Sequence, residues 1–353
     1  MSRFFSARHT GLTPYTPGEQ PRDAQYIKLN TNESPFPPPQ SVIDAAAAEA
    51  GRLQLYSDPE CTELAAAAAA HFGVSTAQLV MTNGSDEVLD FAFQAFADEM
   101  HPLVFPDITY GFYPVFAARS RIPYTEIPLK DDFSIDPADY IGRRCTIVIA
   151  NPNAPTGKAL PRDEIARIVR GNPDGVVIVD EAYVDFGGES AVPLTAKFDN
   201  LLVTQTFSKS RSMAGARLGF GIGAPSLIAD LQTIRCAVNP YNVNRMTAAA
   251  GIAALREQPY FDRCRAQIVE NRAYTAKALR SRGFDVVDSA ANFLFAQAPD
   301  SDGETLYRDL KARGVLVRHF DKPRIANYNR ITIGTRAQMD ALLAAIDAIR
   351  AAK

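Results

Sequence analysis

The strongest constraint on the fold is an alternation of short apolar segments with longer helical patterns between residues 78 and 223. Most of the short segments are apolar along their whole length, which is typical of strands buried on both faces. Helices between such strands supply the crossovers that parallel pairing needs. The sequence therefore predicts an α/β fold whose large domain has a mainly parallel seven-stranded sheet covered by helices. The predicted strands are 79–82, 103–105, 124–127, 146–150, 176–179, 201–204 and 218–222.

The chain is also expected to divide into three parts. Its 353 residues exceed the usual size of one domain. Residues 1–40 are rich in Pro, Gly and Asn, which predicts an extended arm. After residue 240 two long helical patterns lead to a second, smaller set of strands and helices. We therefore expect a large domain over 41–240 and a small α/β domain over 241–353.

Composition narrows the class of partner. The net charge of −3 provides no basic excess for nucleic acid or an anionic membrane. No run approaches the ~18–20 apolar residues of a membrane span, and no apolar signal segment follows Arg3 and Arg8. The four cysteines and four histidines are scattered without metal-ligand spacing, so we expect no metal site. A soluble, cytoplasmic protein with reduced thiols is expected.

A polar loop with one lysine follows the sixth predicted strand. Lys209 has the hydroxyl neighbours Thr206, Ser208 and Ser210, and Arg217 follows eight residues later. A lysine amine is a good nucleophile at neutral pH only when burial or a nearby cation lowers its pKa. A lysine beside a second cation and several hydroxyls suits a phosphorylated cofactor that carries a carbonyl group. Taken alone, however, such a lysine is more often a solvated loop residue.

Other predicted strands end in side chains that suit the same ligand, and ligands of open α/β sheets bind beyond the carboxyl ends of the strands. Gly84 and Ser85 open a helix whose free amides can hold a phosphate. Tyr110 offers an aromatic face to a flat ring. Asp180 and Tyr183 follow the fifth strand, where a buried carboxylate needs a charged partner such as a protonated ring nitrogen. Each feature alone also suits a helix cap, core packing or a loop cap.

A competing motif is the segment 219–224, GFGIGA, which matches the G-x-G-x-x-A pattern of dinucleotide-binding folds. The acidic residue expected ~20 positions further on is missing, because residue 244 is Asn. We therefore interpret these glycines as positions where a strand packs closely against its neighbours.

In order and spacing, these residues resemble the PLP-dependent aminotransferases of fold type I, class I/II, over nearly the whole chain. The lysine loop, Asp-Glu-Ala-Tyr at 180–183 and Asn-Gly-Ser-Asp-Glu at 83–87 carry this resemblance. Within that group the chain is most similar to the histidinol-phosphate aminotransferase family. This narrower similarity lies in the arm at 12–15, the run at 30–33, Tyr56, the lysine loop and the segment 330–335.

The resemblance implies a role in PLP binding for most of these residues. Lys209 would bind the cofactor covalently and move the proton between substrate and cofactor. Asp180 would keep the pyridine nitrogen protonated, Tyr183 would hydrogen-bond the ring hydroxyl, and Tyr110 would stack on the ring. The other cofactor-binding residues implied, most of them around the phosphate, are Gly84, Ser85, Asp86, Thr206, Ser208 and Arg217.

The resemblance also implies an obligate homodimer. In the family, a tyrosine corresponding to Tyr56 reaches the cofactor phosphate of the partner subunit, and the arm would join the small domain to the dimer interface.

One position departs from the family pattern. The asparagine that often precedes Pro-Thr-Gly and contacts the ring hydroxyl is replaced by Ala154. Either Asn153 or Asn151 substitutes for it, or Tyr183 makes that contact alone.

On the substrate side, Arg330 matches an arginine that binds the α-carboxylate in amino-acid aminotransferases and the substrate phosphate in the histidinol-phosphate family. Arg318, Tyr15 and Asn32 match other positions around the substrate. These matches predict an anionic substrate without choosing between phosphate and carboxylate.

The expected reaction is a ping-pong transamination in which glutamate donates the amino group and imidazole-acetol phosphate accepts it. Three alternatives remain at this point. They are an aromatic or other amino-acid aminotransferase, a PLP decarboxylase resembling threonine-phosphate decarboxylase, and a catalytically idle protein with the PLP fold.

Overall fold

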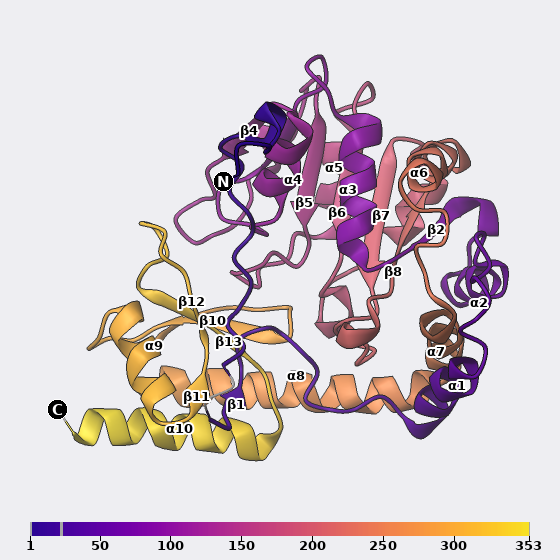
Figure 1. Cartoon of the computed structure of the whole chain (residues 1–353). Coiled ribbons are helices and arrows are strands. Elements are labelled where there is room, and N and C mark those ends of the chain that lie inside the picture. The colour runs from indigo at the N-terminus through magenta and orange to yellow at the C-terminus, as the bar shows by residue number, and fades with distance from the viewer. Residues whose placement is uncertain (1, 22–23, 353) are drawn as a thin grey trace.

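The computed structural model describes residues 2–21 and 24–352 and consists of a larger and a smaller lobe (Figure 1). The larger lobe is built on a seven-stranded sheet in the order β2-β8-β7-β6-β5-β3-β4. Neighbouring strands are parallel except where β8 pairs with β2 and β7. The predicted fold is therefore confirmed. The strands are β2 (Leu79–Thr82), β3 (Leu103–Pro106), β4 (Tyr124–Ile127), β5 (Thr146–Ala150), β6 (Val177–Asp180), β7 (Leu201–Thr206) and β8 (Gly219–Gly223).

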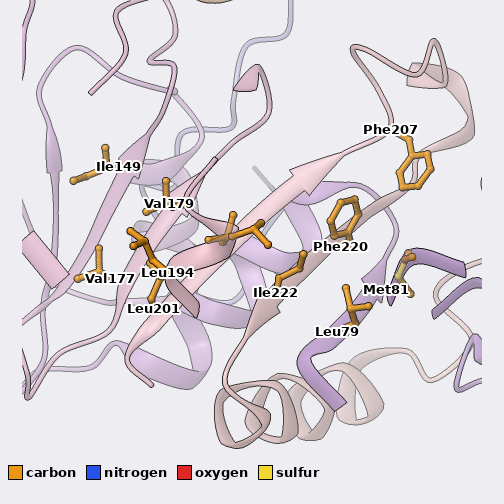
Figure 2. Packing of buried hydrophobic residues seen from close by; sticks show 14 of the residues in the cluster. Leu79, Met81, Ile149, Val177, Val179, Leu194, Leu201, Phe207, Phe220 and Ile222 are labelled. Atoms are coloured by element: carbon orange, nitrogen blue, oxygen red, sulfur yellow. The ribbon is translucent and has the colours of Figure 1, made fainter. Parts of the chain in front are cut away.

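Helices cover both faces of this sheet, which explains why its central strands are apolar throughout. In β6, Val177 and Val179 belong to the hydrophobic core on one face, and Ile178 belongs to the core on the other. Figure 2 shows Val177 and Val179 packed near Leu201 in the first of these cores. The helices α2 (Thr62–Phe72), α5 (Arg162–Arg170) and α7 (Arg245–Arg256) contribute to this core, and α3 (Ser85–Phe96), α4 (Tyr113–Ser120) and α6 (Pro225–Val238) to the other.

The glycines of β8 lie where neighbouring backbone or side-chain atoms approach closely, as the sequence interpretation expected. A Cβ added to Gly219 would lie 2.3 Å from the amide nitrogen of Ser85, and one added to Gly221 would lie 3.0 Å from a methyl group of Val88. The absence of side chains therefore lets β8 lie directly against the turn that begins α3.

Replacing Gly219 by alanine is expected to destabilise the fold by about 1–3 kcal/mol, because the new methyl group meets backbone that cannot rotate away. The midpoint of urea unfolding measures this change. The matched control is Gly51→Ala, since Gly51 has an ordinary φ of −71° and its added Cβ would meet nothing closer than 4.0 Å. Equal unfolding midpoints for the two variants would refute the packing interpretation of Gly219.

The smaller lobe contains a four-stranded antiparallel sheet in the order β12-β13-β10-β9. A separate two-stranded pairing joins β1 of the N-terminal arm to β11 in parallel. The sequence analysis predicted neither β1 nor β12, because a two-residue strand has no periodicity. The elements are β1 (Ile27–Lys28), α8 (Gln258–Arg280), β9 (Asp285–Val287), β10 (Phe293–Gln297), α9 (Gly303–Ala312), β11 (Val315–Leu316), β12 (Arg318–His319), β13 (Tyr328–Thr332) and α10 (Arg336–Ala351).

The two lobes have separate hydrophobic cores. Ala250 and Ala254 of α7 share a core with the large sheet, and α7 packs against α1 (Gln40–Ala50) and α2. Residues from Ile268 onward in α8 belong to the core of the smaller lobe. The division of the chain near residue 240 remains a prediction. Over the described ranges 2–21 and 24–352, no helix has both the length and the apolar character needed to cross a bilayer.

Candidate active site

A cavity of about 500 Å³ lies where the carboxyl ends of the large sheet face the smaller lobe and the N-terminal arm. Ala150, Asp180 and Thr206 line it from the ends of β5, β6 and β7. This edge is where open α/β sheets bind their ligands. The cavity brings together most of the predicted site residues, namely Tyr15, Asn32, Ser85, Asp86, Tyr110, Asp180, Tyr183, Thr206, Ser208, Lys209, Arg217, Arg318 and Arg330.

Lys209 supplies the amine of the cavity. It lies in the loop after β7, where its Nζ donates a hydrogen bond to the carbonyl oxygen of Thr31 at 3.3 Å. The same nitrogen lies 5.7 Å from the centre of the Tyr183 ring. Across the described ranges, the structure records no carboxylate in salt-bridge contact with this amine.

Asp180 supplies a buried carboxylate at the end of β6. Its side chain accepts a hydrogen bond from the hydroxyl of Tyr113 at 2.8 Å and one from the amide of Ala182 at 3.3 Å. Burial raises the pKa of Asp180 to about 6, while the hydrogen bond from Tyr113 acts in the opposite direction. A buried carboxylate with few donors favours a cationic partner, and a protonated ring nitrogen is one.

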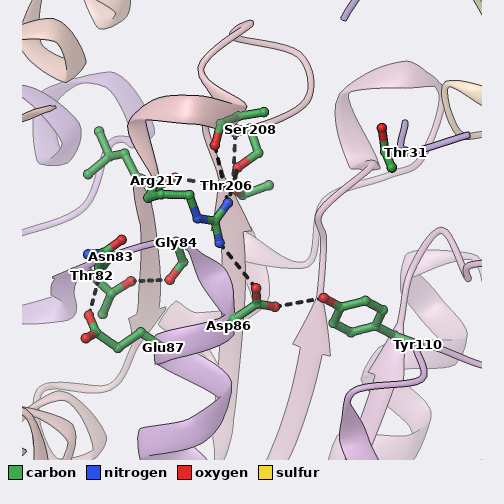
Figure 3. A network of polar contacts seen from close by, with 12 residues as sticks. Thr31, Thr82, Asn83, Gly84, Asp86, Glu87, Tyr110, Thr206, Ser208 and Arg217 are labelled. Carbon is green, nitrogen blue, oxygen red and sulfur yellow. Dashed lines mark hydrogen bonds and ion pairs between the residues drawn. The ribbon is translucent and has the colours of Figure 1, made fainter. Parts of the chain in front are cut away.

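A network of polar contacts lies at the start of α3 (Figure 3). The guanidinium of Arg217 contacts Asp86 at 3.2 Å and the hydroxyl of Ser208 at 3.4 Å. Thr206 donates to the same Ser208 oxygen at 2.9 Å, and the hydroxyl of Tyr110 donates to Asp86 at 3.0 Å. A cation, two hydroxyls and a helix N-terminus together can bind a phosphate.

Tyr183 is held from the smaller-lobe side. Its hydroxyl accepts a hydrogen bond from the side-chain amide of Asn32 at 2.9 Å. Asn32 is itself fixed, because its backbone amide donates to Thr332 at 2.9 Å and its carbonyl accepts from Asn292 at 3.0 Å. The arm and the smaller lobe therefore set the position of a tyrosine that follows β6 of the larger lobe.

Two arginines of the smaller lobe line the same cavity. Arg330 donates to the carbonyl of Asn30 at 3.0 Å, and its buried Nε has no hydrogen-bond partner in the described part of the chain. Arg318 donates hydrogen bonds to two arm carbonyls, those of Pro17 and Thr16, at 3.2 and 3.1 Å. Among the salt bridges of the described residues neither arginine has a carboxylate partner, so both are available to an anionic ligand. Tyr15 lies nearby, stacked on Phe112.

Residues 24–346 match the sequence model of the family "Aminotransferase class I and II". The chain is 50% identical to histidinol-phosphate aminotransferase 1 of Bordetella parapertussis, with 99% of each chain covered. It is 48% identical to the histidinol-phosphate aminotransferase of Aromatoleum aromaticum, with 98% of this chain and 99% of that protein covered. The chain belongs to the histidinol-phosphate aminotransferase family, within the class I and II aminotransferases. It is therefore a PLP-dependent transferase.

Solved structures agree with this assignment. The aminotransferase superposes on the histidinol-phosphate aminotransferase of Sinorhizobium meliloti, which was solved in complex with pyridoxal-5'-phosphate, with a TM-score of 0.84 at 26% identity. That match covers 92% of this chain and 91% of that chain. The aspartate aminotransferase of Thermus thermophilus, at 21% identity and a TM-score of 0.79, shares the fold.

The residues of this aminotransferase fit PLP. The cavity offers an amine, a buried carboxylate and a network with a guanidinium at a helix N-terminus, which match the aldehyde, ring nitrogen and phosphate of the cofactor. Gly84 shows how tightly the network is built, since a Cβ there would lie 2.6 Å from a guanidinium nitrogen of Arg217. The described residues contain no group of three or more His, Cys, Asp or Glu side chains suited to a metal ion.

Four residues singled out in the sequence do not line the cavity of the aminotransferase. Gly84 lies next to the guanidinium of Arg217. Asn153 is buried, and its side-chain amide contacts Thr109, Ile108 and Thr156. Asn151 exchanges both of its side-chain hydrogen bonds with Leu160. The side-chain groups of both asparagines are therefore occupied by neighbouring residues. Tyr183 does line the cavity and is the remaining candidate to contact the ring hydroxyl of the cofactor.

Tyr56 is the fourth of these residues. It is 80% exposed and stacks on Tyr241. In a single chain its ring does not line the cavity.

Two residues that the sequence analysis did not select also belong to the site. The carbonyl of Thr31 contacts Lys209, and the hydroxyl of Tyr113 contacts Asp180. A carbonyl contact depends on backbone position and has no sequence signal. Tyr113 is an aromatic residue at the start of a helix. An ordinary core tyrosine can occupy the same position, so the sequence does not single it out.

Proposed function

We propose that this aminotransferase moves the amino group of L-glutamate to imidazole-acetol phosphate, forming 2-oxoglutarate and L-histidinol phosphate in histidine biosynthesis. The observation that carries the proposal is the 46–50% identity to several histidinol-phosphate aminotransferases over nearly the full length. Two arginines without carboxylate partners in the same cavity as Lys209 support an anionic substrate.

In the proposed mechanism, PLP supplies an electron sink for the bonds at the substrate Cα when it is bound. Lys209 would take the proton from the substrate Cα and release it again later in the reaction. Asp180 holds a proton at the ring nitrogen, because a carboxylate buried among few donors is stabilised by a cation. Tyr183 donates to the ring hydroxyl while its own oxygen is held by Asn32. Tyr110 covers one face of the ring.

The remaining residues bind charged groups. We propose that Ser85, Ser208, Thr206 and Arg217 hold the cofactor phosphate, with Asp86 orienting the guanidinium of Arg217. Arg330 and Arg318, with Tyr15 and Asn32 beside them, bind the substrate anion. Gly84 supports the phosphate site through its backbone, and Asn153 supports the loop beside Ala154. Most of these residues are therefore proposed to contact the cofactor or the substrate directly, and Gly84 and Asn153 are proposed to support a neighbouring residue.

The substrate is tested by titrating the PLP-loaded protein with L-histidinol phosphate and, in parallel, with L-phenylalanine. We expect histidinol phosphate to remove the visible absorption band of the bound cofactor at a concentration at least about tenfold lower than phenylalanine does. The reason is that a phosphate offers two charges to the arginines. A response to phenylalanine alone would instead identify an amino-acid aminotransferase. Release of carbon dioxide from an amino-acid phosphate would identify a decarboxylase.

A cytoplasmic homodimer whose active sites are completed across the interface is also part of the proposal. Several apolar or aromatic side chains are exposed, namely Tyr56, Leu53, Leu55 and Val238. Their exposure supports a surface that a second subunit covers. The pairing of β1 with β11 supports an arm that joins the small domain to this interface. The four cysteines are free thiols, which suits a reducing compartment.

Tyr56→Phe tests the shared site. If the hydroxyl reaches the cofactor phosphate of the partner subunit, the variant is expected to bind PLP about 3- to 15-fold more weakly, without change in the dimer mass measured by sedimentation. Tyr241→Phe, which changes the ring stacked on Tyr56, is the matched control. A monomeric wild-type protein with full activity would contradict the proposal.

A further inference from the structure

Tyr113, at the start of α4, is a buried tyrosine whose hydroxyl contacts the carboxylate of Asp180. The side chain is 0% exposed. Its oxygen donates to Oδ2 of Asp180 at 2.8 Å, and this is its one hydrogen bond within the described residues. Burial raises the pKa of Tyr113 well above its ordinary value. The hydroxyl therefore keeps its proton and acts as a donor throughout the working pH range.

Packing alone does not account for this hydroxyl. The ring of Tyr113 lies 5.6 Å from that of Phe105 and 6.2 Å from that of Phe93, in an apolar setting that a phenylalanine would fill equally well. A hydroxyl buried without a partner costs free energy. The hydroxyl of Tyr113 therefore contributes to the protein through its hydrogen bond to Asp180. The ring also packs edge-on against Tyr110, which lines the cavity.

The carboxylate of Asp180 depends strongly on this donor. Its second hydrogen bond, from the amide of Ala182, is longer, at 3.3 Å. Burial raises the pKa of Asp180 to about 6, the bond from Tyr113 lowers it, the charge of Asp86 raises it and that of Lys209 lowers it. The hydroxyl of Tyr113 is therefore the closest neutral group that favours the ionised carboxylate.

We propose that Tyr113 is a positioning residue, which holds one oxygen of Asp180 and so fixes the orientation of the carboxylate toward the ring nitrogen of bound PLP. Tyr113 itself touches neither cofactor nor substrate. The inference rests on the role of Asp180 in the proposed function. Loss of the hydroxyl leaves the carboxylate held only by the longer bond from Ala182 among the described residues. It also makes the carboxylate a stronger base, so that it takes a larger share of the proton at the ring nitrogen.

The test compares wild-type protein with Tyr113→Phe. We expect the variant to bind PLP about 5- to 30-fold more weakly in equilibrium dialysis at pH 7, since a hydrogen bond to a charged group is lost. With ring-labelled [¹⁵N]PLP, the nitrogen resonance is expected to move toward the unprotonated position. The acid midpoint of PLP binding is expected to shift to higher pH, because removing a donor to the ionised form raises the pKa of Asp180 above about 6.

Tyr140→Phe is the matched control. Tyr140 is similarly buried, but its hydroxyl has no hydrogen-bond partner among the described residues. Its removal is therefore expected to leave PLP affinity, the ¹⁵N resonance and the acid midpoint unchanged. Urea unfolding of both variants reports any general loss of stability. If Tyr113→Phe changes only its unfolding midpoint, as a purely structural tyrosine would, the proposal is refuted.

The Asp180→Asn background separates this inference from the role of Asp180. In that background Tyr113→Phe is expected to change PLP affinity by less than about twofold, because the tyrosine acts through the carboxylate. An Asp180→Asn protein with unaltered PLP affinity and ¹⁵N resonance would refute the proposed function of Asp180. A large effect of Asp180→Asn together with no cofactor effect of Tyr113→Phe would refute the positioning role alone.

Discussion

Replacing Lys209 by alanine is expected to reduce turnover by about 10⁴-fold or more. Lys209 is the one lysine among the described residues that line the cavity, so no neighbouring amine can take over its covalent and proton-transfer roles. The initial rate of transamination measures the loss, and the visible absorption band of the lysine-bound cofactor is expected to disappear with it. The fold should be retained, because the side chain lies at the cavity and its one described hydrogen bond is to Thr31.

Two variants interpret that result. Lys209→Arg keeps the positive charge but offers no amine that can lose its proton, so it should be as inactive as the alanine variant. Lys197→Ala removes an exposed lysine away from the cavity and should leave the rate unchanged. Turnover in Lys209→Ala at even a hundredth of the wild-type rate would contradict the mechanism.

Replacing Arg330 by alanine is expected to raise the KM for histidinol phosphate by about 30- to 4,000-fold, while PLP remains bound. Truncating one partner of a buried charge pair costs about 2–5 kcal/mol, and each 1.4 kcal/mol is a factor of ten in affinity. Because Arg330 lies on β13 of the smaller lobe, the substitution leaves Arg217 and the proposed phosphate site of the cofactor intact. Steady-state kinetics measures KM, and the visible spectrum measures cofactor content.

The controls address charge and packing separately. The guanidinium of Arg330 lies 5.3 Å from the ring of Phe293 and 5.5 Å from that of Phe320, so truncation also removes packing. Arg330→Gln keeps much of the volume without the charge and should show nearly the full rise in KM. Arg313→Ala, at an exposed arginine after α9, should show none. Loss of PLP from Arg330→Ala would mean that this arginine belongs to the cofactor site instead.

The sequence was a good guide wherever a few neighbouring residues decide the structure. Segments such as Leu79–Thr82 and Thr146–Ala150 were located to the residue, because strands buried on both faces are apolar without interruption. Lys209 and Asp180 could be selected because each follows such a strand, and the carboxyl ends of the strands share one edge.

Partners that are distant in the sequence could not be predicted in the same way. Asn32 was matched to a substrate position, and only the structure shows that its side-chain amide also contacts the hydroxyl of Tyr183, 151 residues away. Asn153 was a candidate for the cofactor ring, but its amide is occupied by Thr109 and Thr156. Both outcomes depend on which loops meet after the lobes have packed.

By itself, the sequence of this aminotransferase determined the α/β fold, the positions of the strands of the large sheet and the residues that carry a chemical group at the edge of that sheet. These properties depend on local periodicity and on the residue type that follows each strand. The tertiary structure alone decided which groups meet, such as Arg217 with Asp86 and Tyr113 with Asp180. A hydrogen bond requires its two atoms within about 3 Å, and only the packing of separate segments brings them to that distance.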